Sequence, residues 1–110
     1  GKTQEMIYNV VASDGRSIRG DKLKVVGNTV DTSTSIYRNS IGDAQLATVW
    51  QDPDFDPQLR AFYYVRVIEI PTPRWTTRDA VHFGELTPEG APLTTQERAY
   101  TSPIWYTPSI

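Results

Sequence analysis

The sequence contains no cysteine and a single histidine. The absence of cysteine excludes disulfide bonds, thiolate metal sites and a cysteine nucleophile. The lone histidine, His82, cannot supply a zinc site that needs several histidine ligands. No apolar run approaches the ~20 residues that cross a bilayer, and we recognise no signal peptide. These absences leave the compartment open, because a cysteine-free domain is stable in either redox setting.

Strong charge of either sign is also missing, since 11 Lys and Arg stand against 13 Asp and Glu, for a net charge of −2. Without a block of like charges, nothing indicates binding to nucleic acid or to an anionic membrane. The glycines are scattered and form no phosphate-binding loop. A length of 110 residues, with 38% hydrophobic and 22% charged residues, predicts one globular domain over residues 1–110 instead of a disordered chain.

The most informative segment, residues 52–67, reads D-P-D-F-D-P-Q-L-R-A-F-Y-Y-V-R-V. It combines an acidic turn that contains Pro57 with a strand in which Tyr63, Val65 and Val67 alternate on one face. A proline turn before Tyr-x-Val-x-Val is typical of the penultimate strand in immunoglobulin-like and fibronectin-like sandwiches. In those folds a corner tyrosine bonds back across the turn, so we expect the Tyr63 ring in the core and its hydroxyl on a backbone group of this turn.

Alternating apolar residues predict further strands. The predicted strands cover residues 4–12, 35–39, 46–51, 61–70 and 98–106. Pro103 in the last of these predicts an edge position or a bulge, because proline cannot donate to a ladder. Together the pattern predicts an antiparallel β-sandwich of roughly six or seven strands, immunoglobulin-like in the broad sense.

The connection before the last strand is long for a small sandwich. Pro71 and Pro73 are expected to end the preceding strand. Roughly thirty residues then follow, more than a hairpin loop requires. Within them, Thr76 is predicted to cap a short helix that continues to Phe83 and stops at Gly84.

The acidic turn resembles the start of a calcium loop, because Asp52, Asp54 and Asp56 alternate. An EF-hand loop needs glycine at its sixth position and glutamate at its twelfth, and Pro57 and Tyr63 stand there instead. We therefore favour a solvated turn whose carboxylates cap neighbouring amides. We assign no metal ligand in this chain.

A nucleophilic site is equally unsupported. His82 could be combined with Ser40 or Ser102, but neither serine lies in a G-x-S-x-G nucleophile elbow. We assign no catalytic residue and no cofactor, and we do not expect this chain to be an enzyme by itself.

The tryptophans allow more than one interpretation. Trp50 and Trp105 lie in predicted strands and are expected to fill the space between two sheets. Trp75 follows Arg74 in the stiff segment P-T-P-R-W, and exposed Trp and Arg are typical of interface hot spots. Local packing within the long connection is an equal alternative for Trp75. Exposed aromatic rings would also suit a carbohydrate platform.

Several strings carry a resemblance to a known family. They are D-P-D-F-D-P, A-F-Y-Y-V-R-V, E-I-P-T-P-R-W, Q-E-R-A-Y-T-S-P-I-W-Y-T-P and, at residues 27–31, G-N-T-V-D. In this order they resemble the C-terminal end of the large bacterial proteins grouped as domain of unknown function 3604. The resemblance implies a parent several times longer than this chain. This chain would be the C-terminal fragment of that parent. The preceding portion resembles metal-dependent phosphoesterases of the polymerase-and-histidinol-phosphatase type, and its ligands have no counterpart here.

Two functions follow as expectations. The first is a non-catalytic accessory domain that packs against the upstream portion, in the cytoplasm or in the cell envelope of a bacterium. The second is a free-standing module that binds carbohydrate or protein. The resemblance also suggests that residues 1–4 are the end of a hairpin turn whose first strand is missing. The strand over residues 4–12 would then keep an unpaired edge through which the chain could self-associate.

Overall fold

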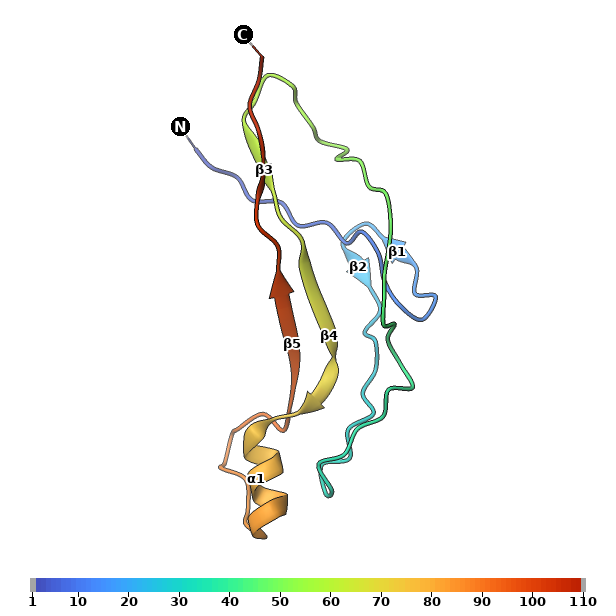
Figure 1. Cartoon of the computed structure of the whole chain (residues 1–110), viewed down its shortest axis with the longest axis vertical. Coiled ribbons are helices and arrows are strands. Elements are labelled where there is room, and N and C mark those ends of the chain that lie inside the picture. Colours follow the sequence, from blue (N-terminus) through green and yellow to red (C-terminus); the bar gives the residue numbers. More distant parts are fainter. Residues whose placement is uncertain (1, 110) are drawn as a thin grey trace.

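A computed structural model describes residues 2–109 of the chain (Figure 1). The elements are β1 (Ile18–Arg19), β2 (Lys22–Leu23), β3 (Ala61–Tyr63), β4 (Arg66–Pro73), α1 (Trp75–Phe83), β5 (Thr94–Tyr100) and β6 (Ile104–Tyr106). All pairing between these strands is antiparallel, in the two-stranded sheets β1–β2, β3–β6 and β4–β5. The predicted antiparallel β class, with one short helix before the final strands, is confirmed.

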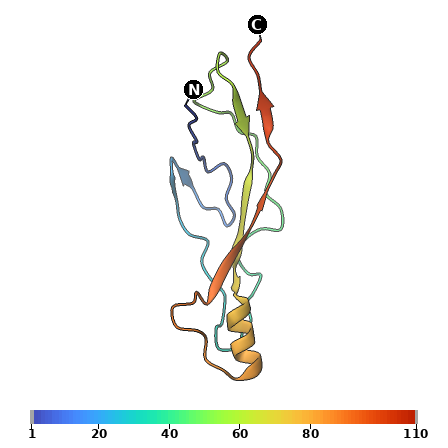
Figure 2. The ribbon, with the colours of Figure 1, turned by 90° about the vertical axis from the view of Figure 1, so that its left-hand side faces the viewer.

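The main feature is a long two-stranded ribbon, which we define as residues 61–73 paired with residues 94–106. Figure 2 shows β4 and β5 twisting around each other along it. Two irregularities interrupt the pairing. Residues 64 and 65 face the longer segment 101–103, and the register shifts again between Ile68 and Pro71. The first irregularity contains Pro103, as the sequence predicted for this proline.

Hydrogen bonds keep the ribbon together across the first irregularity. The Thr101 N–H donates to the Val65 carbonyl at 3.0 Å, and the Val65 N–H donates to the Thr101 hydroxyl at 2.8 Å. A side-chain oxygen thus replaces one rung of the ladder. The strands predicted at 61–70 and 98–106 are therefore present, each divided into two short strands.

The prolines of β4 do not end it. Pro71 pairs with Gln96 and Pro73 pairs with Thr94, so β4 continues three residues beyond the predicted end at Ile70. A proline is tolerated in an edge strand wherever its missing N–H would have pointed away from the partner strand. The connection to β5 consequently shortens to residues 74–93.

Helix α1 begins at Trp75, one residue before the predicted cap. Its N-cap is Arg74, which makes no side-chain capping bond. The predicted stop is confirmed: Gly84 adopts the left-handed conformation, with φ of 68°, that favours glycine at this position. The buried Thr77 hydroxyl donates to the Leu93 carbonyl at 2.8 Å, and the Arg74 N–H donates to the same oxygen at 3.0 Å. These bonds tie the start of the helix to the start of β5.

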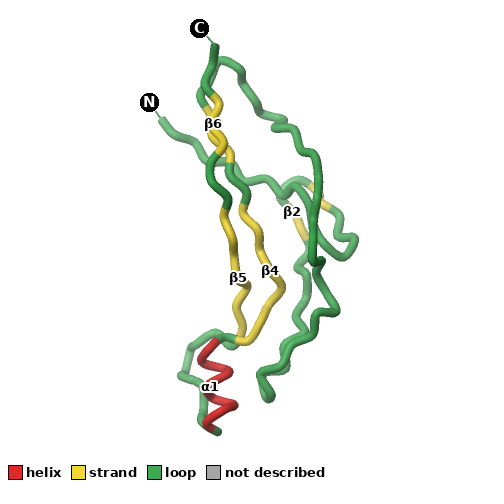
Figure 3. The backbone as a smooth tube through the Cα atoms, viewed as in Figure 1, coloured by secondary structure: helices red, strands yellow, loops and turns green. Residues whose placement is uncertain are grey.

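The predicted strands at residues 4–12, 35–39 and 46–51 do not form. Outside the named strands, the described residues contain one isolated bridge, between Asp31 and Ile36. Loops make up most of the N-terminal half (Figure 3). Alternating side chains favour extended backbone, but a strand also needs a neighbour that satisfies its N–H and C=O groups. In residues 2–109 no strand pairs along these segments, and the single bridge at Ile36 does not extend into a ladder.

The loop between β2 and β3 extends along β4 and returns (Figure 1). It approaches the ribbon tightly at Gly42, where an added Cβ would lie 2.7 Å from Cγ2 of Ile70. The Gly42 N–H also donates to the Asp14 carboxylate at 2.7 Å, which ties this loop to the turn near the N-terminus. Glycine is required here by both the close approach and a φ of 78°.

No hydrophobic side chain is buried among the described residues. The radius of gyration is 18.9 Å, against roughly 13 Å for a compact domain of this length. The two sheets of the ribbon lie end to end and do not stack on each other as the halves of a sandwich would (Figure 1). None of the helices over residues 2–109 is long and apolar enough to span a membrane.

Candidate interaction surfaces

The two faces of the ribbon differ in what covers them. On the face that carries Tyr63 and Tyr106, the N-terminal half contributes three aromatic rings. Trp50 lies 6.4 Å from the Tyr63 ring, between centroids, and Tyr8 lies 5.1 Å from Trp50. Phe55 packs edge-on against Tyr106, with centroids 4.9 Å apart. We call this the covered face.

The acidic turn is anchored to the covered face by tyrosine hydroxyls. Tyr63 donates to Oδ2 of Asp52 at 2.7 Å, and Tyr8 donates to Oδ2 of Asp54. The bond to a turn carbonyl that was expected from Tyr63 is made by Tyr106, whose hydroxyl donates to the Pro57 carbonyl at 2.8 Å. The predicted corner bond of Tyr63 is therefore wrong: Tyr63 is half-buried and binds a turn carboxylate, and the bond to a turn carbonyl comes from Tyr106.

The carboxylates also cap amides within the turn, as predicted. Oδ1 of Asp52 accepts from the Asp54 N–H, and Oδ1 of Asp56 accepts from the Gln58 N–H, each at 2.8 Å. Such bonds stabilise tight turns without any ion. No group of three or more His, Asp or Glu side chains within residues 2–109 is arranged to hold a metal.

The hydroxyl–carboxylate bonds affect the tyrosines. Donation to Asp54, together with desolvation and the negative charge of that carboxylate, raises the pKa of Tyr8 to about 12. Donation to Asp52 raises the pKa of Tyr63 in the same way. Both hydroxyls are therefore held as neutral donors, which suits a structural role and not that of a general base.

The opposite face of the ribbon carries four exposed aromatic side chains, which we call the aromatic row. They are Trp105, Phe62, Tyr64 and Tyr100, in spatial order. Successive ring centroids lie 5.1, 6.4 and 6.3 Å apart. Trp105 was expected between two sheets, and 71% of it is exposed. Trp50 lies in a loop and is 38% exposed.

Polar groups meet the aromatic row at Tyr64. The Tyr64 hydroxyl donates to the Glu5 carboxylate at 3.2 Å and accepts from Nη2 of Arg66 at 3.3 Å. The Arg66 guanidinium also lies over the Tyr100 ring, 5.4 Å from its centroid, a geometry that attracts a cation to the ring face. Arg66 is thereby positioned beside the row.

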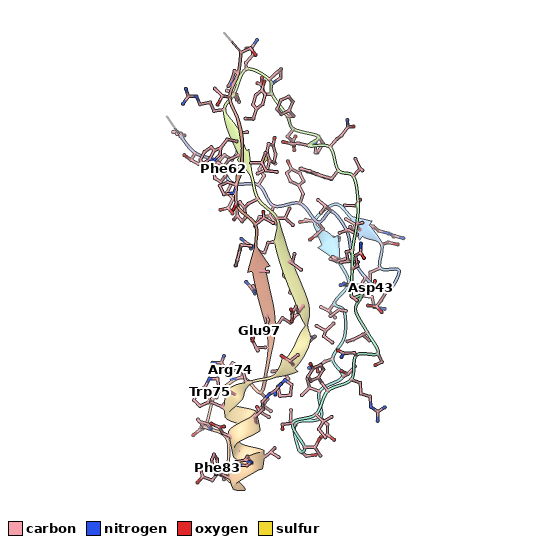
Figure 4. All side chains as sticks on the ribbon, viewed as in Figure 1. Asp43, Phe62, Arg74, Trp75, Phe83 and Glu97 are labelled. Carbon is pink, nitrogen blue, oxygen red and sulfur yellow. The ribbon has the colours of Figure 1, made fainter. Side chains whose placement is uncertain are left out.

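The predicted interface pair, Arg74 and Trp75, lies at the other end of the ribbon. Figure 4 places both at the start of the helix, far from Phe62 along the long axis. Trp75 is 66% exposed, and Nε of Arg74 is buried without a hydrogen-bond partner. A shallow groove there is largely polar. Its lining residues are Tyr37, Glu69, Thr72, Pro73, Arg74, Trp75, Arg78, Thr95 and Glu97.

The remaining predicted structural residues are only partly covered. Pro57, Val65 and Val67 are exposed, and Tyr63 is half-buried. His82 lies in the last turn of α1 with its ring edge-on to Phe83, at 4.7 Å between centroids. The aromatic row was missed by the sequence analysis, although the period of two already places Phe62 and Tyr64 on the face opposite Tyr63. The cross-strand neighbours Trp105 and Tyr100 depend on a register that the sequence does not specify.

A family model described as "Protein of unknown function (DUF3604)" matches residues 1–108. The chain belongs to the DUF3604 family. No curated protein and no solved structure is significantly similar to this DUF3604 chain. The match covers the ribbon, the helix and the N-terminal half together.

Proposed function

We propose that this chain is a non-catalytic accessory part of a larger DUF3604 protein, and that it becomes fully folded by packing against an upstream portion of the same polypeptide. That portion would be the one that resembles metal-dependent phosphoesterases. The observation that carries the proposal is the exposed surface. The chain has 9489 Å² of accessible surface, whereas a folded monomer of its mass exposes roughly 6,100 Å².

The size of the excess, about 3,400 Å², bears on the kind of partner. A standard interface covers roughly 800 Å² on each side, and obligate dimers cover about 1,000–2,500 Å² on each side. A second copy seated symmetrically would therefore leave much of the excess uncovered. A larger body that contacts the chain on more than one side accounts for it better.

Additional strands would also complete the fold. A two-stranded ribbon is only marginally stable in water, and within residues 2–109 β4 and β5 pair only with each other. We propose that strands outside this chain join the ribbon to build the immunoglobulin-like sandwich that its sequence resembles. The apolar side chains on one face of β4, such as the exposed Val67, would then enter the core of that sandwich.

A non-catalytic role agrees with how the polar groups are used. Asp52, Asp54 and Asp56 accept hydrogen bonds from tyrosine hydroxyls or turn amides. Such groups hold the chain in its conformation. The contribution to the parent would be to shape or cover its active site.

The test uses the full-length parent with a protease site placed before residue 1. After folding and cleavage, the 110-residue piece is expected to remain bound to the upstream portion during size-exclusion chromatography. Separated in urea, it should bind a hydrophobic dye and unfold without a cooperative transition. A separated piece that stays folded, excludes the dye and does not rebind would contradict the proposal.

A second candidate function is a module that binds carbohydrate or protein on its own. The aromatic row favours it, because exposed Tyr and Trp rings stack on sugar faces. It requires the separated piece to be folded. Titration of that piece with cellohexaose and chitohexaose, giving saturable binding that Trp105→Ala removes, would favour this second function over the first.

A further inference from the structure

We infer that the aromatic row is the face by which this chain docks on the larger body, and that the opposing protein surface is apolar with a carboxylate placed opposite Arg66. The inference rests on the proposed function, since it names the surface that this packing uses. It concerns the side chains of Trp105, Phe62, Tyr64 and Tyr100.

The two faces of the ribbon differ in how far the N-terminal half of the chain covers them. Adjacent residues of a strand point to opposite faces, so Tyr63 and Tyr64 mark the two sides. On the Tyr63 side, the chain itself supplies Tyr8, Trp50 and Phe55. On the Tyr64 side, no aromatic ring of the described N-terminal half packs against the row, and Glu5 accepts a hydrogen bond from the Tyr64 hydroxyl. Within residues 2–109, the face of the aromatic row is therefore the less covered of the two.

The row is continuous and contains the residue types of an interface centre. It crosses both strands of the ribbon, because Phe62 pairs with Trp105 and Arg66 pairs with Tyr100. Exposed fractions are 71% for Trp105, 58% for Tyr100 and 48% for Phe62. Trp, Tyr and Arg are enriched among the residues that dominate binding energy. Aromatic side chains also lose little conformational entropy when they are covered.

Arg66 defines the chemistry of the opposing surface. Its contacts with the Tyr64 hydroxyl and the Tyr100 ring hold the guanidinium beside the row. An arginine has five donors, and the contact with Tyr64 uses one nitrogen of the group. The remaining donors match a carboxylate, which arginine binds in a bidentate manner.

A protein surface fits the row better than a sugar does. A sugar site places free polar side chains beside its rings to bind hydroxyl groups. Of the polar neighbours of the row, Glu5 already accepts from the Tyr64 hydroxyl, and Arg66 keeps free donors in a fork that matches a planar carboxylate. The groove beside Trp75 is a weaker docking candidate, because charged residues such as Glu69, Arg78 and Glu97 contribute much of its lining.

The chain offers a matched pair for the experiment. Trp105 and Trp75 are equally large and similarly exposed, at 71% and 66%, but lie at opposite ends of the ribbon. In the full-length parent cleaved before residue 1, Trp105→Ala should weaken retention of the piece by at least roughly tenfold. Trp75→Ala should change it by less than about twofold, because truncation away from a hot spot costs little. Arg66→Lys should also weaken retention, because lysine keeps the charge but loses the bidentate geometry.

A second measurement needs no variant. Hydroxyl-radical footprinting of the uncleaved parent should leave Trp105 protected and Trp75 oxidised. Oxidation of Trp105 at the rate of Trp75, or retention that depends on Trp75 and not on Trp105, would overturn the inference while the piece still binds. Saturable release of the piece by added cellohexaose would assign the aromatic row to sugar binding instead. If the unmodified piece does not bind the upstream portion at all, the proposed function itself fails.

Discussion

The hydroxyl of Tyr63 lies 2.7 Å from Oδ2 of Asp52, across a turn that separates the two residues by 11 positions. The adjacent Tyr64 points to the other face, where its exposed hydroxyl is 3.2 Å from Glu5. A hydrogen bond to a carboxylate is stronger when it is shielded from water. Tyr63→Phe should therefore lower the free energy of unfolding of the full-length protein more than Tyr64→Phe does. Urea unfolding of the two variants measures the difference, and a larger effect at Tyr64 would mean that the faces are wrongly assigned.

Tyr8 predicts a loss of stability at alkaline pH. Its pKa is raised from 10.0 to about 12 by donation to Asp54, so the folded state holds the proton more tightly than the unfolded state. The stabilisation is complete below pH 10 and is lost as the pH rises through 12. Unfolding measured over this range should show a smaller decline for Tyr8→Phe than for the unmodified protein. An identical decline in both would show that the Tyr8–Asp54 bond does not contribute.

Alanine substitutions at two glycines distinguish the cost of backbone strain from the cost of a steric conflict. Gly42 and Gly90 have nearly equal φ, 78° and 77°, so alanine at either should cost roughly 1–2 kcal/mol for the left-handed backbone. At Gly42 the new Cβ would also lie 2.7 Å from Ile70, whereas at Gly90 it meets no atom within 4 Å. Gly42→Ala should therefore destabilise the protein by about 1–3 kcal/mol more than Gly90→Ala. Equal effects in urea unfolding would mean that the loop carrying Gly42 does not pack on β4.

Adjacent threonines at the start of α1 should respond in opposite directions. Thr77 is 1% exposed and donates to the Leu93 carbonyl, so Thr77→Val should cost about 1 kcal/mol. The Thr76 hydroxyl is buried without a partner, and Thr76→Val removes this unsatisfied group. We expect the second variant to be neutral or stabilised in thermal unfolding of the full-length protein. A loss at Thr76 equal to that at Thr77 would contradict the assigned contacts.

The parts of the fold that could be predicted from the sequence are those with local causes. The strand that starts at Ala61 has a clear period of two, and Gly84 ends the helix because left-handed backbone favours glycine. The predicted cap was wrong because the helix already begins after Arg74, whose N–H donates to the Leu93 carbonyl, an acceptor that only the folded connection brings near. Chain-distant partners of this kind leave no local trace.

The missing strands have a related explanation. Met6, Tyr8 and Val10 alternate as in a strand, but alternation reports side-chain preference and not the presence of a pairing neighbour. The expectation that Pro71 and Pro73 end β4 was wrong for a similar reason. Whether a proline ends a strand depends on which edge of the strand is paired, and the sequence does not specify that edge. Arg74 and Trp75 are adjacent in the sequence, whereas the alignment of Trp105 with Phe62 depends on the strand register, which the sequence does not specify.

The ribbon also has a consequence for how such a protein is made. A two-stranded ribbon with exposed aromatic rings and unpaired edges is a template for aggregation until it is covered. In the proposed parent, attachment to the upstream portion within one polypeptide would keep that portion at an effective concentration on the order of millimolar. Packing of the ribbon within one molecule would then be faster than its association with other molecules. Selection on this ribbon would therefore act on solubility in the cell as strongly as on the final assembly, and variants in it should first be recognised by their yield.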